Sequence, residues 1–257
     1  MLEYVQALMG FGLPTLLLLI VGATVAGFID AICGGGGLIS VPVLLMAGFN
    51  PAQAMAANKL QGTLGALTST HYYLGKGIIN PTILRSLGLG AMLGGALGTG
   101  FVYLIGNHFM EMLLPFMLIA MALYFIFSGQ VGDHPKKSVL GLSALAFYVV
   151  PAIGFYDGFF GPGAGTFYMT ALISLAGMAV TQAVAYSRAL NLISNATSML
   201  LFILLGKMVW AAGIAMSIGE VIGVYLGSHF VHKNGVRLVR PLVVAACIAM
   251  SIKSILS

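Results

Sequence analysis

The sequence has few charged residues and almost no cysteine. Asp, Glu, Lys and Arg make up only 7% of its 257 residues, with six acidic residues against eleven basic ones. Soluble domains contain about 25% charged residues, so this composition excludes a soluble globular protein. The two cysteines, Cys33 and Cys247, lack the number and spacing of a disulfide framework or a metal site.

Hydrophobic residues, in contrast, make up 60% of the chain. The net charge of +5 comes from basic residues scattered along apolar segments and short loops, so it indicates a membrane topology signal and no nucleic-acid surface. The length allows about ten apolar segments of about 20 residues, each long enough to cross a hydrocarbon core of roughly 30 Å. We therefore expect a multi-pass membrane protein.

The apolar segments form two sets of five around one polar connection. This division predicts a first transmembrane repeat at 1–128, a linker at 129–137 and a second transmembrane repeat at 138–257. The predicted segments are 11–33, 38–48, 51–74, 84–105 and 110–128, followed by 138–157, 165–177, 182–205, 209–229 and 236–256.

Short motifs recur in both halves, which indicates that the whole half is duplicated. An odd number of crossings per half makes the two copies antiparallel, and the positive-inside rule then places the linker and the basic loops 75–85 and 228–240 in the cytoplasm. Segments 38–48 and 165–177 are short, so full spans and re-entrant hairpins both remain open for them. The predicted fold is all-α and polytopic, with two inverted-topology repeats of four to five helical segments each.

The most unusual duplicated motif has an aspartate at the end of an apolar run, followed by a helix-breaking Gly/Pro cluster. The copies are Gly27-Phe28-Ile29-Asp30 before Gly34–Gly37, and Gly154-Phe155-Tyr156-Asp157 before Gly161-Pro162-Gly163. An intramembrane acid is costly and therefore a functional candidate, and paired broken segments indicate a transporter binding site. Asp30 and Asp157 either cap the opened backbone or handle protons or substrate, and the two roles are compatible.

Basic and amide side chains supply the other candidates. Lys59 and Arg188 occupy equivalent positions about two turns inside helices, where each either extends to the membrane surface or points inward to a shared site. Asn191 and Asn195 follow Arg188 on one helix face, and Asn58 precedes Lys59 on the corresponding helix. A polar stripe of this kind faces protein or water, which favours the inward orientation.

The glycine clusters complete this predicted anion site. New helices begin after them, and helix N-termini bind anions through free N–H groups and the helix dipole. Their candidate residues are Gly34, Gly36, Gly161 and Gly163. Glu220 lies within the ninth segment and its repeat partner is Gly95, so it breaks the symmetry; it is either one member of a buried pair or a proton carrier.

These motifs resemble the sulfite exporter TauE/SafE family of bacterial membrane proteins. The similarity covers nearly the whole chain and includes Gly34-Gly35-Gly36-Gly37-Leu38-Ile39-Ser40-Val41-Pro42 and Ala57-Asn58-Lys59, besides both aspartate motifs. The resemblance implies secondary transport, as an exporter, of sulfur-containing anions such as sulfite, sulfonates and organosulfur compounds across the cytoplasmic membrane.

We therefore predict a transporter of a small anion, with a proton- or cation-coupled transporter of another small solute and an anion channel as alternatives. An enzyme is not expected, because the few polar residues form no recognisable nucleophile–base pair. The expected partners are the small anion and membrane lipid, with no cofactor, metal or nucleic acid, and a homodimer is left open. The expected location is the bacterial cytoplasmic (inner) membrane.

Overall fold

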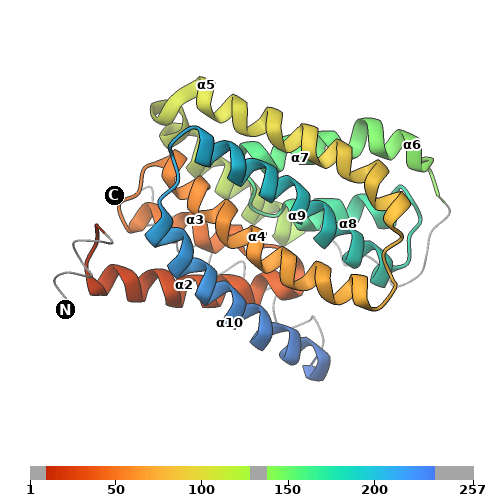
Figure 1. Ribbon diagram of the computed structural model, residues 1–257, viewed down its shortest axis with the longest axis horizontal. Helices are drawn as coiled ribbons and strands as arrows, with labels where there is room; N and C mark the ends of the chain where they lie inside the picture. The colour runs from red at the N-terminus through yellow and green to blue at the C-terminus, as the bar shows by residue number, and fades with distance from the viewer. Residues whose placement is uncertain (1–9, 128–137, 235–257) are drawn as a thin grey trace.

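The computed structural model describes residues 10–127 and 138–234, and every regular element within these ranges is a helix. The predicted linker at 129–137 and the predicted last segment at 236–256 lie outside the described residues. The described helices form one bundle in which the two halves of the chain are intermixed (Figure 1). The structure thus confirms an all-α polytopic fold.

The helices of the first half closely match the predicted segments. α2 covers Leu13–Cys33, α3 covers Gly37–Met46, α4 covers Pro51–Gly75 and α5 covers Pro81–Phe127. Gly106 has non-helical angles within α5 (φ 75°, ψ 171°), so α5 consists of two helices that meet at a break. α4 starts with a capping box, in which Asn50 Oδ1 accepts from the Gln53 N–H at 3.0 Å.

The second half begins with a continuous helical rod of three parts. These are α6 (Leu142–Ala144), a π-helical turn (Leu145–Val149) and α7 (Val150–Phe159). The π-helical turn ends two residues before Pro151, which has no N–H to continue the regular helical ladder.

Three further helices follow, namely α8 (Ala164–Ser174), α9 (Val180–Leu204) and α10 (Trp210–Asn234). The sequence predicted a basic loop at 228–240, but α10 extends to Asn234. The first part of this prediction is therefore wrong. No glycine or proline interrupts the chain between Ser228 and Asn234, so the helix continues to the residue before Gly235.

Five described helices are long and apolar enough to cross a membrane: Leu13–Ala31, Pro81–Met121, Leu142–Phe159, Val180–Leu204 and Trp210–Gly227. α3 and α8 have 10 and 11 residues, which corresponds to lengths of only about 15–17 Å. Because the hydrocarbon core is roughly 30 Å thick, neither can span it alone. The question that the sequence left open for 38–48 and 165–177 is therefore answered in favour of half-length helices.

The helices of the two halves pack against each other reciprocally. α4 and α9 lie side by side, α2 of the first half packs on α10 of the second, and α7 of the second half packs on α5 of the first. This exchange is what two repeats related by a two-fold axis would produce. It supports the inverted relation of the repeats, which stays a prediction.

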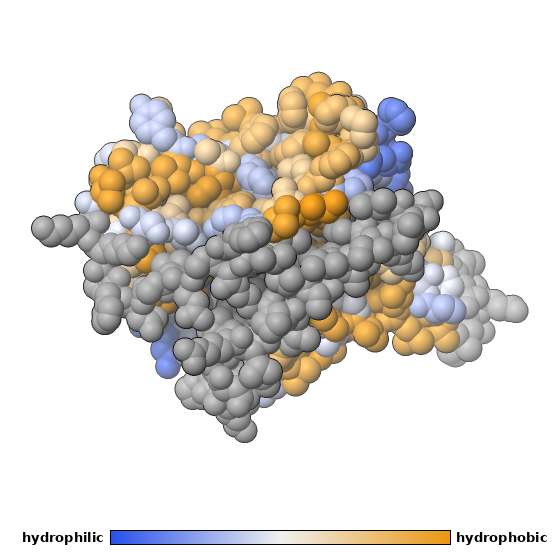
Figure 2. Space-filling model, turned by 180° about the vertical axis from the view of Figure 1, so that it is seen from behind, coloured by the Kyte–Doolittle hydropathy of each residue, from blue (hydrophilic) through white to orange (hydrophobic). Residues whose placement is uncertain are grey.

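Glycines allow the close approach of α5 to α7 and of α10 to α2. A Cβ atom added to Gly94 or Gly98 of α5 would collide with the backbone of α7, and one added to Gly223 would collide with the backbone of α2. The outer surface is apolar, with Leu104, Phe147 and Leu204 each more than three-quarters exposed. Figure 2 shows hydrophobic residues over much of the coloured surface of one face, as expected for contact with lipid.

Candidate functional site

The two glycine-rich helix breaks meet inside the bundle. α2 ends before Gly34, which has a left-handed φ of 74°, and α7 ends before the loop that contains Gly161, with φ 94°. A Cβ atom on Gly34 would lie 3.0 Å from the backbone nitrogen of Thr166, and one on Gly37 would lie 3.0 Å from Pro162 Cα. The duplicated motifs therefore converge from the two halves, as the sequence predicted.

Two ion pairs cross between the halves at this point. Lys59 Nζ lies 2.6 Å from Asp157 Oδ1, and Arg188 Nη1 lies 2.7 Å from Asp30 Oδ2. Each cation also donates to the backbone carbonyl of its aspartate. The cation of each half therefore neutralises the acid of the other half and binds the end of its broken helix.

Lys59 does not extend to the membrane surface, because its side chain is fully buried. The inward orientation, one of the two alternatives for this residue, is the one that the structure adopts. The partner of Lys59 is an acid, however, so its charge is already compensated inside the protein.

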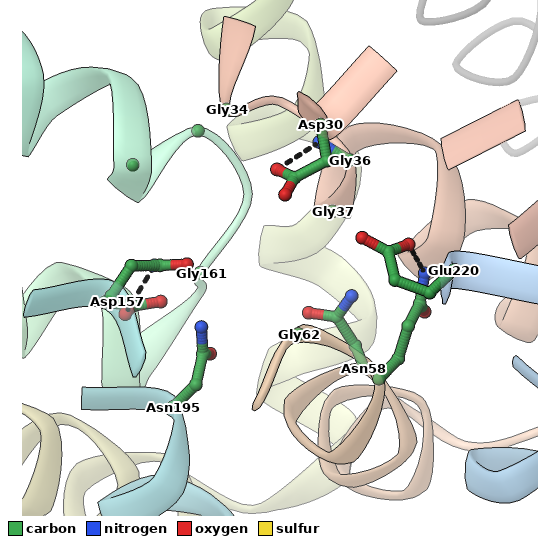
Figure 3. Close-up of a pocket in the computed structure, with 14 residues that line it drawn as sticks. Asp30, Gly34, Gly36, Gly37, Asn58, Gly62, Asp157, Gly161, Asn195 and Glu220 are labelled. Atoms are coloured by element: carbon green, nitrogen blue, oxygen red, sulfur yellow. Dashed lines mark hydrogen bonds between the residues drawn. The ribbon is translucent and has the colours of Figure 1, made fainter. Parts of the chain in front are cut away.

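A small polar cavity of about 30 Å³ lies between the breaks. Figure 3 shows Asp30, Glu220 and Asn58 on one side of it and Asp157 and Asn195 on the other. The cavity is lined by ten of the predicted site residues, namely Asp30, Gly34, Gly36, Asn58, Asp157, Gly161, Gly163, Asn191, Asn195 and Glu220. Gly37, Gln61, Gly62 and Gly165 complete the wall.

Lys59 and Arg188 are not among the lining residues. The structure brings the two predicted cations to the site but sets them behind the aspartates that they neutralise. Direct contact of either cation with a substrate stays a prediction. Their observed contacts are structural, since Lys59 ties α4 to the end of α7 and Arg188 ties α9 to the end of α2.

The two aspartates have different surroundings. Asp30 accepts from the backbone N–H of Gly36 at 3.3 Å, so the predicted capping of the break is confirmed for this residue. Asp157 instead accepts from side chains of α9, the Ser194 hydroxyl and the Asn191 amide, besides Lys59. Asp157 is the more firmly held of the two carboxylates.

Glu220 enters the cavity from α10 and is 2% exposed. Its Oε2 accepts a hydrogen bond from Gln61 Nε2 at 2.6 Å. The sequence analysis missed both Gln61 and Ser194. Each lies three residues after an asparagine that it did select, Asn58 or Asn191, so extending the polar stripe by one helical turn would have found them.

The first turns of α3 and α8 also reach the cavity, through Gly36 and Gly37 in one half and Gly163 and Gly165 in the other. A helix N-terminus carries a partial positive charge and N–H donors, so these turns can attract a negatively charged group. Asn58, Asn191 and Asn195 add side-chain amides to the wall. The cavity thus combines hydrogen-bond donors of neutral groups with three carboxyl groups.

Comparisons with known proteins agree on one family. The family model described as "Sulfite exporter TauE/SafE" matches residues 18–254. The chain is 39% identical over 247 residues to a "Probable membrane transporter protein" of Haemophilus influenzae, covering 96% of this chain and 97% of that protein. It is also 36% identical over 231 residues to the "Probable membrane transporter protein YfcA" of Escherichia coli, covering 90% and 86% of the two chains. No solved structure matches the chain.

Proposed function

Because this chain belongs to the sulfite exporter TauE/SafE family, we propose that it exports a small sulfur-containing anion, such as sulfite, a sulfonate or a related organosulfur compound. It is a membrane transporter, embedded through its apolar helices. We place it in the bacterial cytoplasmic membrane and assign it no enzymatic reaction. The substrate class and the direction rest on the name of the family.

The observation that carries this proposal is the cavity between the two helix breaks. An anion there would meet the N-terminal turns of α3 and α8 from opposite sides and the side-chain amides of Asn58 and Asn195. Such donors suit a compact oxyanion, because several N–H groups can point at its oxygens at once. Lys59 and Arg188 hold the breaks in place through their aspartates and contribute positive potential from behind.

The proposed transport cycle uses the duplicated architecture. Inverted repeats that meet at a midplane site open it alternately to the two sides by rocking against each other. The volume of the cavity, about 30 Å³, is far smaller than that of an open pore. This favours a transporter over the alternative of an anion channel.

The other alternative is a proton- or cation-coupled transporter of a different small solute. The observation in its favour is the presence of three carboxyl groups in the cavity wall, those of Asp30, Asp157 and Glu220. Binding experiments with anions and cations of similar size would separate the two proposals.

Asn195→Leu tests the anion site, because it replaces a lining amide with an apolar side chain that has the same number and branching of heavy atoms. A hydrogen bond to a charged partner contributes about 1.5–3 kcal/mol, so we expect roughly 10- to 100-fold weaker binding of sulfite and thiosulfate. Binding would be measured by the rise in melting temperature of the purified protein, and flux in proteoliposomes.

Thr197→Val is the matched control, since Thr197 bonds Ile193 O of its own helix and is not in the cavity wall. It should leave binding unchanged. Equal affinity of Asn195→Leu and the wild type would contradict the proposed site. Stabilisation by alkali cations or neutral solutes, with none by any sulfur anion, would contradict the proposed substrate class.

A further inference from the structure

Glu220 lies at a position where the two halves of the site differ. Its repeat counterpart is Gly95, and the residue that it packs on, Gly65, has Ser194 as its counterpart. A Cβ atom on Gly65 would lie 2.9 Å from Glu220 Oε1, so the glutamate fits only because α4 has no side chain there. In the other half, a Cβ atom on Gly95 would lie 3.0 Å from Ser194 O, which leaves no room for an acid.

These differences between the two halves also change the surroundings of the two aspartates. Asp157 accepts hydrogen bonds from Ser194 and Asn191 of α9. The counterparts of these two donors on α4 are Gly65 and Gly62, which have no side chains to offer to Asp30. Glu220 occupies this region instead, so the half of the site that contains Asp30 has an additional acid where the other half has additional donors.

The charges of the site do not cancel when every group is ionised. Lys59 balances Asp157, and Arg188 balances Asp30. These are the charged groups that face the site from α4, α7, α9 and α2, and Glu220 of α10 adds one negative charge. An ionised Glu220 would repel an anion that enters the cavity, and a proton on Glu220 would remove this repulsion.

Gln61 provides the surroundings that such a proton requires. Its Nε2 donates to Glu220 Oε2 at 2.6 Å, and its Oε1 is buried with no hydrogen-bond partner among the described residues. A side-chain amide can serve both states of a carboxyl group, because Nε2 donates to a carboxylate and Oε1, after rotation of the amide, accepts from a carboxyl O–H.

We propose that Glu220 takes up a proton from water when the anion binds, so that one proton and one anion occupy the site together. This inference rests on the proposed function, because it assigns the coupling ion of the same site. Linkage makes the effect reciprocal: if the anion raises the affinity of the protein for the proton, the proton raises its affinity for the anion by the same factor. Anion binding must therefore be stronger at lower pH. In this proposal the ion pairs of Arg188 with Asp30 and of Lys59 with Asp157 stay intact throughout.

The first test uses the wild-type protein with thiosulfate and methanesulfonate, two anions that do not titrate between pH 5.5 and 8.5. We expect affinity to fall with rising pH by up to about tenfold per pH unit, the limit for one linked proton. Binding in weakly buffered solution should remove about one proton from the medium per anion, detected with a pH indicator. Binding without proton uptake would overturn the inference even if no variant could be purified.

The second test is Glu220→Gln, which keeps the shape of the protonated carboxyl group. Its anion affinity should be independent of pH and close to that of the wild type at pH 5.5. Glu111→Gln is the matched control, because Glu111 is exposed on α5 and absent from the cavity wall, and it should keep the pH dependence of the wild type.

The outcomes separate the two proposals. Anion binding with the same pH dependence in wild type and Glu220→Gln would refute the role of Glu220 and leave the proposed function intact. Absence of binding of either anion to both proteins at every pH would refute the proposed substrate class, and the coupling would fall with it.

Discussion

Lys59 shows how a charged side chain can be stable in the interior of a membrane protein. Its ammonium group is fully buried, but it contacts the carboxylate and the backbone carbonyl of Asp157. Asp157 has further donors in Ser194 and Asn191. A buried ion pair offsets its desolvation only when the remaining hydrogen-bonding groups are also satisfied, which is the case here.

This arrangement predicts a strong coupling between the two members of the pair. Lys59→Gln alone leaves the buried carboxylate of Asp157 without its cation and should destabilise the protein by about 3–5 kcal/mol. The double variant Lys59→Gln/Asp157→Asn removes both charges and should recover much of this loss. Unfolding in denaturing detergent, followed by circular dichroism, measures the two single variants, Lys59→Gln and Asp157→Asn, and the double variant.

Arg85→Gln serves as the control, since Arg85 is exposed and its loss should change stability little. If the double variant were as unstable as the sum of the two single variants, Lys59 and Asp157 would be energetically independent, contrary to the structure.

The charged residues of the site could be predicted from the sequence, but which cation pairs with which acid could not. Asp30, Asp157, Lys59 and Arg188 were selected because charged residues are rare in apolar segments and recur in both halves. The pairs join residues 98 and 158 positions apart, so only the packing of the helices determines which cation meets which acid. The sequence therefore predicted two cations facing a substrate, whereas in the structure both cations lie behind the aspartates of the cavity wall that they neutralise.

At the scale of elements, helix lengths and breaks were the best predicted features. Long apolar runs bounded by Gly, Pro and Asn gave segments that agree with the helices of the structure to within about one turn. The end of α10 was the least accurate, because charged residues after Gly227 suggested a loop while the backbone contains no residue that stops a helix before Gly235.

The contact between α5 and α7 gives a prediction about packing. A Cβ atom on Gly98 would collide with the carbonyl oxygen of Phe155, while a Cβ atom on Gly100, two residues further along α5, would have no neighbour within 4 Å. Gly98→Ala should therefore destabilise the protein by about 1–3 kcal/mol through overpacking, and Gly100→Ala should be neutral or slightly stabilising. Thermal unfolding of the purified variants measures both.

Because the two substitutions are chemically identical and lie in the same helix, any general effect of alanine cancels between them. Equal melting temperatures would show that α5 and α7 are not in close contact at Gly98.

At the scale of the whole molecule, the loops gather at two opposite ends. Phe11, Phe49, Ile105 and Val209 pack on one hydrophobic cluster, and the rings of Phe11 and Phe49 are 5.9 Å apart. Ile78, Leu140, Leu175 and Met178 pack on the other cluster, where the N–H of Leu140 donates to Leu175 O at 2.9 Å. The site lies where the two helix breaks meet.

The distribution of charge predicts which end faces the cytoplasm. The end that contains Ile78 and Leu140 carries Lys76 and Arg85, and the sequence adds the pair Lys136-Lys137 just before Ser138. The opposite end carries Lys207 in the connection between α9 and α10. The positive-inside rule therefore places the first end in the cytoplasm.

Cysteine labelling tests this orientation in a chain whose two native cysteines are replaced by alanine. Lys76→Cys and Val139→Cys, at exposed positions of the predicted cytoplasmic end, should react with a membrane-impermeant maleimide in inside-out vesicles and stay unlabelled in right-side-out vesicles. His108→Cys, exposed just after the break in α5, should show the opposite pattern. Labelling of all three from the same side would contradict the helix arrangement, because the two ends would then not lie across the membrane from each other. Labelling of each position from both sides would mean that the chain inserts in both orientations and that its basic residues do not determine the topology.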